Sequence, residues 1–185
     1  MGRHEGRKWP REIWSLRRAP GKICHHAILL IGSKGNIRAL RCVIGRSGIS
    51  VFKREGDGAT PAAQLGLLGG YMARRAWPVR NRELSAITPD KGWCDAPTHS
   101  CYNRPVRLPF SASHETLHRP DGLYDICLVL DWNIAPRQRY RGSAIFFHLA
   151  RHGGEPTEGC IAVSRRHMDL ILRRLATNIV IRVIA

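Results

Sequence analysis

The residues with the clearest capacity for chemistry lie between Ile145 and Ser164, in the run IFFHLARHGGEPTEGCIAVS. His148 sits near the end of an apolar, β-prone stretch, and a glycine-rich loop leads from it to Cys160. A thiol needs a base to become a thiolate at neutral pH. An imidazole within hydrogen-bond reach can supply that base and orient the attack. The pair therefore indicates acyl transfer, with Cys160 as nucleophile and His148 as its base.

The residues beside the cysteine fit the same chemistry. Gly159 leaves the approach to the sulfur open and lets the backbone turn sharply. Backbone N–H groups near Gly159 and Cys160 are natural oxyanion donors, and Glu158 belongs to the same loop. A simpler interpretation is also open, because a single cysteine in an apolar segment is usually a small buried hydrophobe. A strand histidine is likewise more often structural than catalytic, so spacing alone does not decide between the two interpretations.

The same segment resembles the catalytic signature of the L,D-transpeptidase (YkuD-like) family, which is a strand histidine, a loop, and then Ser/Thr-His-Gly-Cys. The matching positions are His148 and the run from Thr157 to Cys160. Four further segments resemble that family: KREGDGATP, GWCD, YNRPVRLPF and LYDICLVLDWN. The resemblance runs from about Cys24 to the C-terminus. It implies a mostly β, sandwich-like catalytic fold, Cys160 as nucleophile, His148 as base, and no metal or organic cofactor.

The resemblance also implies a substrate and a compartment. The family cuts the bond between the third residue and D-Ala of a peptidoglycan stem tetrapeptide, forms a thioester, and lets an amine acceptor resolve it. The expected partners are peptidoglycan stem peptides, and the expected location is the periplasm or cell envelope. Two other functions stay open: a cysteine hydrolase in which water resolves the thioester, and a catalytically silent module that binds the wall or a polyanion. The acceptor and the oligomeric state are not indicated.

Two positions near the nucleophile depart from the family's pattern. Glu158 stands where most members have His, so a second imidazole is missing, and we expect activity to survive because His148 can serve as base. Ala162 stands where the family often has Arg. A nearby arginine could then hold the substrate carboxylate instead, and a long loop could add further contacts. The candidate substrate-binding residues are Arg141, Arg151, Asn103 and Arg104.

The charge and the cysteine content of the chain limit the kinds of partner and metal site that we expect. Lys and Arg number 30 against 14 acidic residues, a net charge of +16 that attracts polyanions. No nucleic-acid-binding signature accompanies the charge, so we predict no nucleic-acid partner. The six cysteines include no C-x-x-C pair, which argues against a structural zinc site. Cys94 and Cys101 bracket a short loop and could form a disulfide or remain free thiols.

The chain length suits one catalytic domain, predicted over 23–185, after a polar, basic N-terminal arm over 1–22. No stretch reaches the roughly 20 apolar residues that a membrane span needs. The first twenty residues lack the apolar segment of an ordinary signal peptide.

Strands dominate the expected secondary structure. Two β-prone runs around Lys34-Gly35 predict a hairpin in which Cys42 lies opposite Ala27. Proline and turn residues over 78–122 predict a long connection with one or two short elements. Ser164 is expected to cap a helix, because Met168, Ile171, Leu172 and Leu175 then share one apolar face. The further strands are expected over 48–52, 65–77, 124–132, 143–150 and 178–184.

Overall fold

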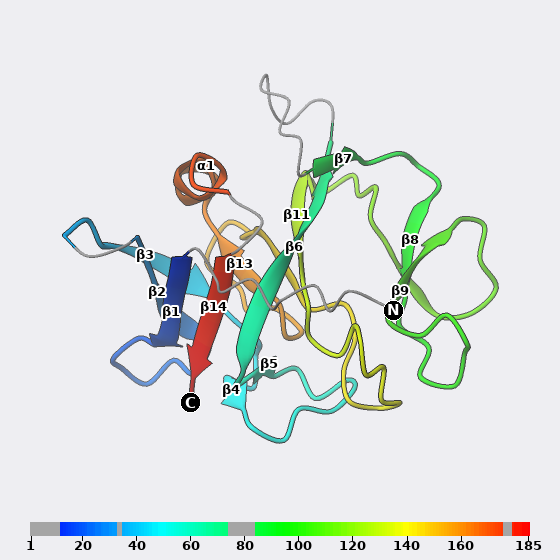
Figure 1. Cartoon of the computed structure of the whole chain (residues 1–185), viewed down its shortest axis with the longest axis horizontal. Coiled ribbons are helices and arrows are strands. Elements are labelled where there is room, and N and C mark those ends of the chain that lie inside the picture. Colours follow the sequence, from blue (N-terminus) through cyan, green and yellow to red (C-terminus); the bar gives the residue numbers. More distant parts are fainter. Residues whose placement is uncertain (1–11, 33–34, 74–83, 176–178) are drawn as a thin grey trace, which may run out of the picture.

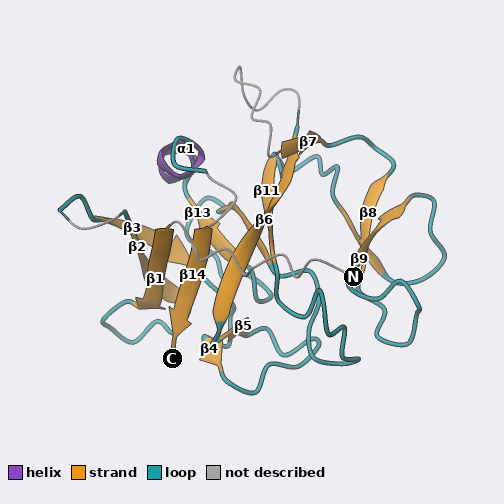
Figure 2. Cartoon of the chain, in the orientation of Figure 1, coloured by secondary structure: helices purple, strands orange, loops and turns teal. Residues whose placement is uncertain are grey.

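The computed structural model describes residues 12–32, 35–73, 84–175 and 179–185. These residues form fourteen strands and a single α-helix, so the predicted mostly β fold is confirmed (Figures 1 and 2). The strands are β1 (Glu12–Arg18), β2 (His26–Ile31), β3 (Arg38–Val43), β4 (Ile49–Ser50), β5 (Thr60–Pro61), β6 (Gln64–Met72), β7 (Leu84–Ala86), β8 (Lys91–Cys94), β9 (Arg104–Arg107), β10 (His114–Thr116), β11 (Ile126–Leu130), β12 (Phe146–Leu149), β13 (Ile161–Val163) and β14 (Ile179–Ile184). The helix is α1 (Arg165–Leu172).

The main sheet closes on itself. Its strand order is β11-β12-β13-β3-β2-β1-β14-β6-β7, and β11 also pairs with β6, so that eight strands form a barrel-like ring with β7 outside it. Side chains alternate between the two faces of a strand, and β2 buries every second residue accordingly. The inward-facing side chains make one large core, which includes Trp14, Leu16, Leu29, Ile31, Leu65, Leu128, Phe147 and Ile181.

The first described strand corrects the predicted N-terminal arm. β1 lies between β2 and β14 in the ring, parallel to β14. Trp14 and Leu16 have no exposed surface. The arm over 1–22 is therefore wrong for Glu12–Arg18, whereas residues 1–11 lie outside the described part. Arginines flank only two inward-facing apolar residues here, so the period-two pattern was too short to stand out in the sequence.

The hairpin and the C-terminal elements agree with the sequence. β2 and β3 are antiparallel, with Ala27 opposite Cys42 as predicted. Ser164 is the N-cap of α1, and its hydroxyl accepts a hydrogen bond from the His167 N–H at 3.3 Å. Met168 on the predicted apolar face of α1 is fully buried in the core. β6 matches the strand expected from residue 65, whose predicted end near residue 77 falls outside the described residues.

The long connection is more regular than predicted. Residues 84–122 contain β7 and a separate three-stranded sheet of order β10-β8-β9, which lies beside the barrel (Figure 1). The expectation of one or two short elements over 78–122 is therefore wrong. Strands of three or four residues are too short for a recognisable alternation. This sheet buries Trp93, whose ring meets that of Phe146 edge-on at 5.2 Å.

Cys94 and Cys101 are free thiols, as are the other four cysteines. Within the described ranges, no helix is long and apolar enough to cross a membrane.

Replacing Trp14 tests whether β1 belongs to the domain. Trp14→Ala removes a fully buried side chain and should lower the free energy of unfolding by about 3–5 kcal/mol. Ile13→Ala on the same strand is the matched control, because Ile13 is 44% exposed; its effect should be about 0.5 kcal/mol. Urea unfolding of the full chain measures both. A small effect of Trp14→Ala would show that β1 is dispensable.

Candidate active site

The pairing of β12 with β13 brings the predicted catalytic residues together. The two strands are parallel, with Phe147 opposite Ile161 and His148 opposite Ala162. Phe147 and Ile161 point into the barrel core. Because neighbouring side chains point to opposite faces, His148 lies on the other face of the sheet. Cys160, directly before β13, faces the same way and packs with Phe146.

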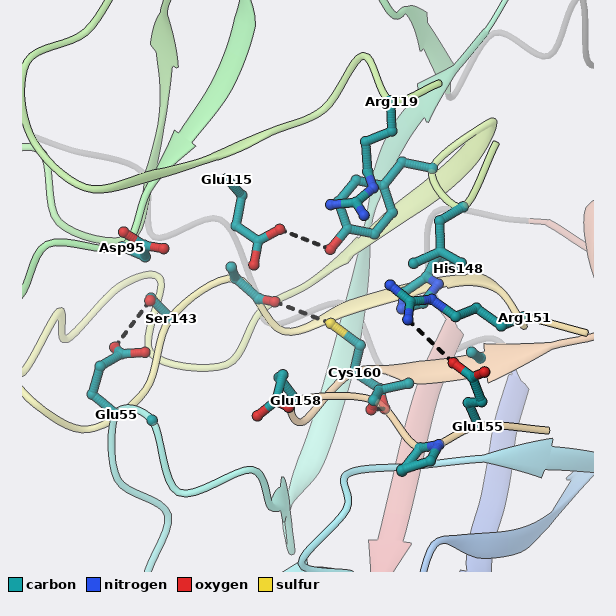
Figure 3. Close-up of a pocket in the computed structure, with 17 residues that line it drawn as sticks. Glu55, Asp95, Glu115, Arg119, Ser143, His148, Arg151, Glu155, Glu158 and Cys160 are labelled. Atoms are coloured by element: carbon teal, nitrogen blue, oxygen red, sulfur yellow. Dashed lines mark hydrogen bonds and ion pairs between the residues drawn. The ribbon is translucent and has the colours of Figure 1, made fainter. Parts of the chain in front are cut away.

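A second apolar cluster covers this face of the sheet. It consists of Trp93, Leu117, Tyr124, Cys127, Val129, Ala144, Phe146 and Cys160. The three-stranded sheet supplies Trp93, and the Tyr124 ring lies edge-on to that of His148 at 5.1 Å. These side chains leave a pocket of about 390 Å³ into which His148 and Cys160 both open (Figure 3).

The Cys160 thiol is held by two backbone groups. Its Sγ donates to the Ala144 carbonyl at 3.2 Å and accepts from the Phe146 N–H at 3.3 Å. In the described part of the chain no hydrogen bond joins this thiol to His148. Burial raises the pKa of Cys160 to about 12. Cys160 is therefore a neutral thiol, and it would need a base to act as the predicted nucleophile.

His148 is oriented to act as that base. The side chain is buried, and its Nδ1 lies 2.8 Å from the Leu149 carbonyl. A carbonyl only accepts hydrogen bonds, so Nδ1 carries the hydrogen and Nε2 keeps its lone pair. Burial lowers the pKa of His148 to about 4, and the charges of Arg119 and Arg151 act in the same direction. The imidazole is thus neutral, and able to take a proton, over the whole range above about pH 4.

The loop before Cys160 packs against the Thr-Pro segment at Thr60 and Pro61. Gly159 has a φ of 133°, and a Cβ there would lie 2.8 Å from the Ala59 carbonyl oxygen, so only glycine fits. The buried Thr60 hydroxyl donates to the Gly159 carbonyl at 2.9 Å and accepts from the Gly45 N–H at 2.9 Å. Thr157 completes the turn, because its hydroxyl donates to the Cys160 carbonyl at 2.6 Å.

These contacts give Gly159 a conformational role. Its own N–H already donates to the Thr157 hydroxyl at 3.2 Å. An oxyanion role for the N–H groups of Gly159 and Cys160 stays a prediction.

Glu158, which occupies the position of the family's second histidine, pairs with Arg46. The Arg46 Nε lies 2.9 Å from Oε2, and the two side chains are 48% and 74% exposed. Glu158 also lines the pocket. Arg46 donates to the Gly56 carbonyl at 3.3 Å, and its backbone N–H donates to the Thr157 carbonyl at 2.8 Å. Sequence reasoning missed Arg46, because its partner lies 112 residues further along the chain.

Of the four candidate substrate-binding residues, Arg151 lines the pocket. It pairs with Glu155 at 3.2 Å on the pocket wall (Figure 3). Asn103 is 1% exposed and makes its hydrogen bonds inside the protein. Arg141 and Arg104 are exposed and are not among the residues that line this pocket.

Other pocket residues had no signal in the sequence. Arg119 forms an ion pair with Asp121 at 2.6 Å, and its guanidinium lies over the Tyr124 ring at 5.2 Å. Glu115 accepts from the Tyr124 hydroxyl at 2.9 Å, and burial raises its pKa. The pocket's carboxylates are Glu55, Asp95, Glu115, Glu155 and Glu158. Over the residues that the structure describes, no three potential metal ligands come together.

Comparison with known proteins agrees with this geometry. A family model for the L,D-transpeptidase catalytic domain, YkuD, matches residues 25–183. The match spans nearly the whole chain, so the chain belongs to the L,D-transpeptidase catalytic domain family, as the sequence motifs predicted. No curated protein and no solved structure matches it. β1 lies before the matched range although it completes the same sheet.

The buried imidazole predicts a specific dependence of stability on pH. The pKa of His148 is about 4 in the folded chain and about 6.5 in an unfolded one. As the pH falls, the unfolded chain therefore binds the proton before the folded chain does. The contribution of the neutral imidazole to the free energy of unfolding is complete above about pH 6.5 and is lost as the pH falls toward 4. Between pH 7.5 and 4.5, the wild-type free energy of unfolding should fall by about 2–3 kcal/mol more than that of His148→Gln. Parallel pH profiles in urea unfolding would contradict the assignment.

His148 and Glu158 should differ sharply in importance. His148→Ala removes the predicted base and should slow thioester formation at Cys160 by about 10²–10⁴-fold. Glu158→Gln breaks only an exposed ion pair and should change the rate by less than about fivefold. Intact-protein mass spectrometry with a stem tetrapeptide measures both rates. An equal loss in the two variants would mean that Glu158 takes part in the chemistry.

Proposed function

We propose that this chain is a peptidoglycan L,D-transpeptidase that forms or remodels cell-wall crosslinks in the periplasm or cell envelope. Family membership supports action on peptidoglycan peptides. The observation that carries the proposal is that His148 on β12 and Cys160, directly before the neighbouring strand β13, open into one pocket. No metal or organic cofactor is required for this chemistry.

The reaction has two half-steps. In the first, His148 Nε2 takes the thiol proton, and Cys160 Sγ forms a bond to the carbonyl carbon of the third stem residue. The C–N bond to D-Ala then breaks, and the D-Ala amine leaves with the proton that His148 held. In the second, an amine acceptor attacks the thioester and gives its proton to His148. The new C–N bond forms, the S–C bond breaks, and the thiol regains a proton.

A neutral thiol and a neutral imidazole suit this order of steps. Burial raises the pKa of Cys160 and lowers that of His148, so a resting thiolate–imidazolium pair is disfavoured. The proton therefore transfers as the carbon–sulfur bond forms. The Phe146 N–H, at 3.3 Å from Sγ, stabilises negative charge on the sulfur during that step. The backbone N–H of Cys160 is the proposed donor to the oxyanion.

The pocket offers groups for both ends of a charged peptide. Arg119 and Arg151 lie on the His148 side and are the proposed contacts for a stem carboxylate (Figure 3). Arg151 would exchange its exposed ion pair with Glu155 for the substrate, which costs little because exposed pairs contribute about 0–1 kcal/mol. The opposite wall carries Glu55, Asp95 and Glu115 and is the proposed side for an ammonium group.

The deciding experiment incubates the protein with a disaccharide-tetrapeptide and identifies the products by mass spectrometry. A crosslinked dimer, or a stem in which D-Ala has been exchanged, is the expected result. A tripeptide would show that water resolves the thioester, as in a hydrolase. Cys160→Ser should form no product, whereas Cys101→Ser, a thiol outside the pocket lining, should behave as wild type. Absence of any product with wild type would favour a silent wall-binding module.

A further inference from the structure

Asn103 is a buried residue with every side-chain partner inside the protein. It is 1% exposed and has a φ of 55°, in the left-handed region that asparagine tolerates better than most residues. Its Oδ1 accepts from the Trp93 indole N–H at 3.0 Å and from the Ala144 N–H at 3.1 Å. Its Nδ2 donates to the Trp132 carbonyl at 3.0 Å. These three bonds fix the amide rigidly beside Ala144.

Ala144 is held in a conformation that alanine seldom adopts. Its φ is 50°, where the Cβ crowds the following carbonyl. The residue before it, Ser143, is held as well, because its hydroxyl donates to Glu55 at 2.9 Å and the same carboxylate accepts from Tyr102. Residues 102 and 103 thus restrain the backbone at 143 and 144 from one side.

The strained residue touches the nucleophile. The Ala144 carbonyl accepts the Cys160 thiol hydrogen at 3.2 Å, and the Phe146 N–H donates to the same sulfur at 3.3 Å. To bond the Ala144 carbonyl and the Phe146 N–H at the same time, the thiol has to take one orientation. The direction of the Ala144 carbonyl therefore sets where Sγ points within the pocket.

We propose that Asn103 is a positioning residue for the nucleophile: it holds Ala144 in the left-handed conformation, so that the Ala144 carbonyl orients the Cys160 thiol toward the pocket. The inference rests on the proposed role of Cys160. It replaces the sequence-based expectation that Asn103 binds substrate. Asn103 acts through Ala144 and does not touch the reacting atoms.

Asn103→Gly tests this proposal, because glycine accepts a φ of 55° and only the side chain is lost. The Ala144 carbonyl should then turn away from the thiol. Loss of an acceptor that favours the protonated thiol lowers its pKa. Alkylation of Cys160 by iodoacetamide at pH 8, followed by peptide mapping, should become about three- to tenfold faster. Thioester formation with the stem tetrapeptide should become roughly 10- to 100-fold slower, because the sulfur is no longer aimed.

Asn133 provides the matched control. It also has a φ of 55° and is buried, and it makes three side-chain hydrogen bonds, to Gln138 and Gly142. Asn133→Gly should destabilise the chain similarly but leave alkylation of Cys160 at the wild-type rate. The same change in alkylation from both variants, or no change from Asn103→Gly, would overturn the proposal.

Two further variants probe the mechanism. Asn103→Asp still accepts from the N–H groups of Trp93 and Ala144, so its rate of thioester formation should exceed that of Asn103→Gly by at least about fivefold; an equal loss would overturn the proposal. Adding Ala144→Gly to Asn103→Gly removes the Cβ that disfavours a φ of 50°, so alkylation and thioester formation should move back toward the wild-type values. No recovery in the double variant would contradict the proposal that Asn103 acts by holding Ala144 in the left-handed conformation. Alkylation reports on Asn103 even if no peptide is transferred, so this proposal and the proposed function can fail separately.

Discussion

The parallel pairing of β12 with β13 is the constraint on which the rest of the site depends. It places His148 and Cys160 on one face of the sheet, while Phe147 and Ile161 anchor the other face in the barrel core. A shift of one residue in this register would send every side chain of the moved strand to the opposite face. The apolar residues that stabilise the barrel therefore also keep the thiol and the imidazole together, so packing of the core and the proposed catalysis share one requirement.

Burial of the two reactive groups determines how the site can work. Both sit on a face covered by a second apolar cluster, and burial favours their neutral forms. A neutral thiol is protected from adventitious modification, yet it must lose its proton in the proposed attack. Two backbone contacts serve these two requirements. The Ala144 carbonyl accepts the hydrogen of the resting thiol, and the Phe146 N–H donates to the sulfur. The reactivity of the Cys160 thiol then depends more on the orientation of these two peptide groups than on a resting charge on the sulfur.

The sequence was most informative where function depends on residues close together in the chain. The segment from His148 to Cys160 contains the strand, the glycine turn and the nucleophile, so motif and geometry coincide. Long-range packing gave no such signal. β1 was missed because charged residues surround two core positions. The burial of Asn103 gave no signal because its partners are the backbone of Ala144 and Trp132 and the indole of Trp93. An asparagine in a proline-rich loop looks like a turn residue until the elements around it are known.

The contacts that hold the loop before Cys160 explain how the chain can carry glutamate at position 158. The loop before Cys160 is held by Thr60, which bonds the Gly159 carbonyl, and by the backbone contact of Arg46 with Thr157. Neither contact uses the side chain at 158, which is 74% exposed and reaches outward to the Arg46 guanidinium. The conformation of the loop before Cys160 therefore does not require an imidazole there. Glutamate in place of histidine changes the charge at the pocket edge, and the ion pair with Arg46 offsets that charge.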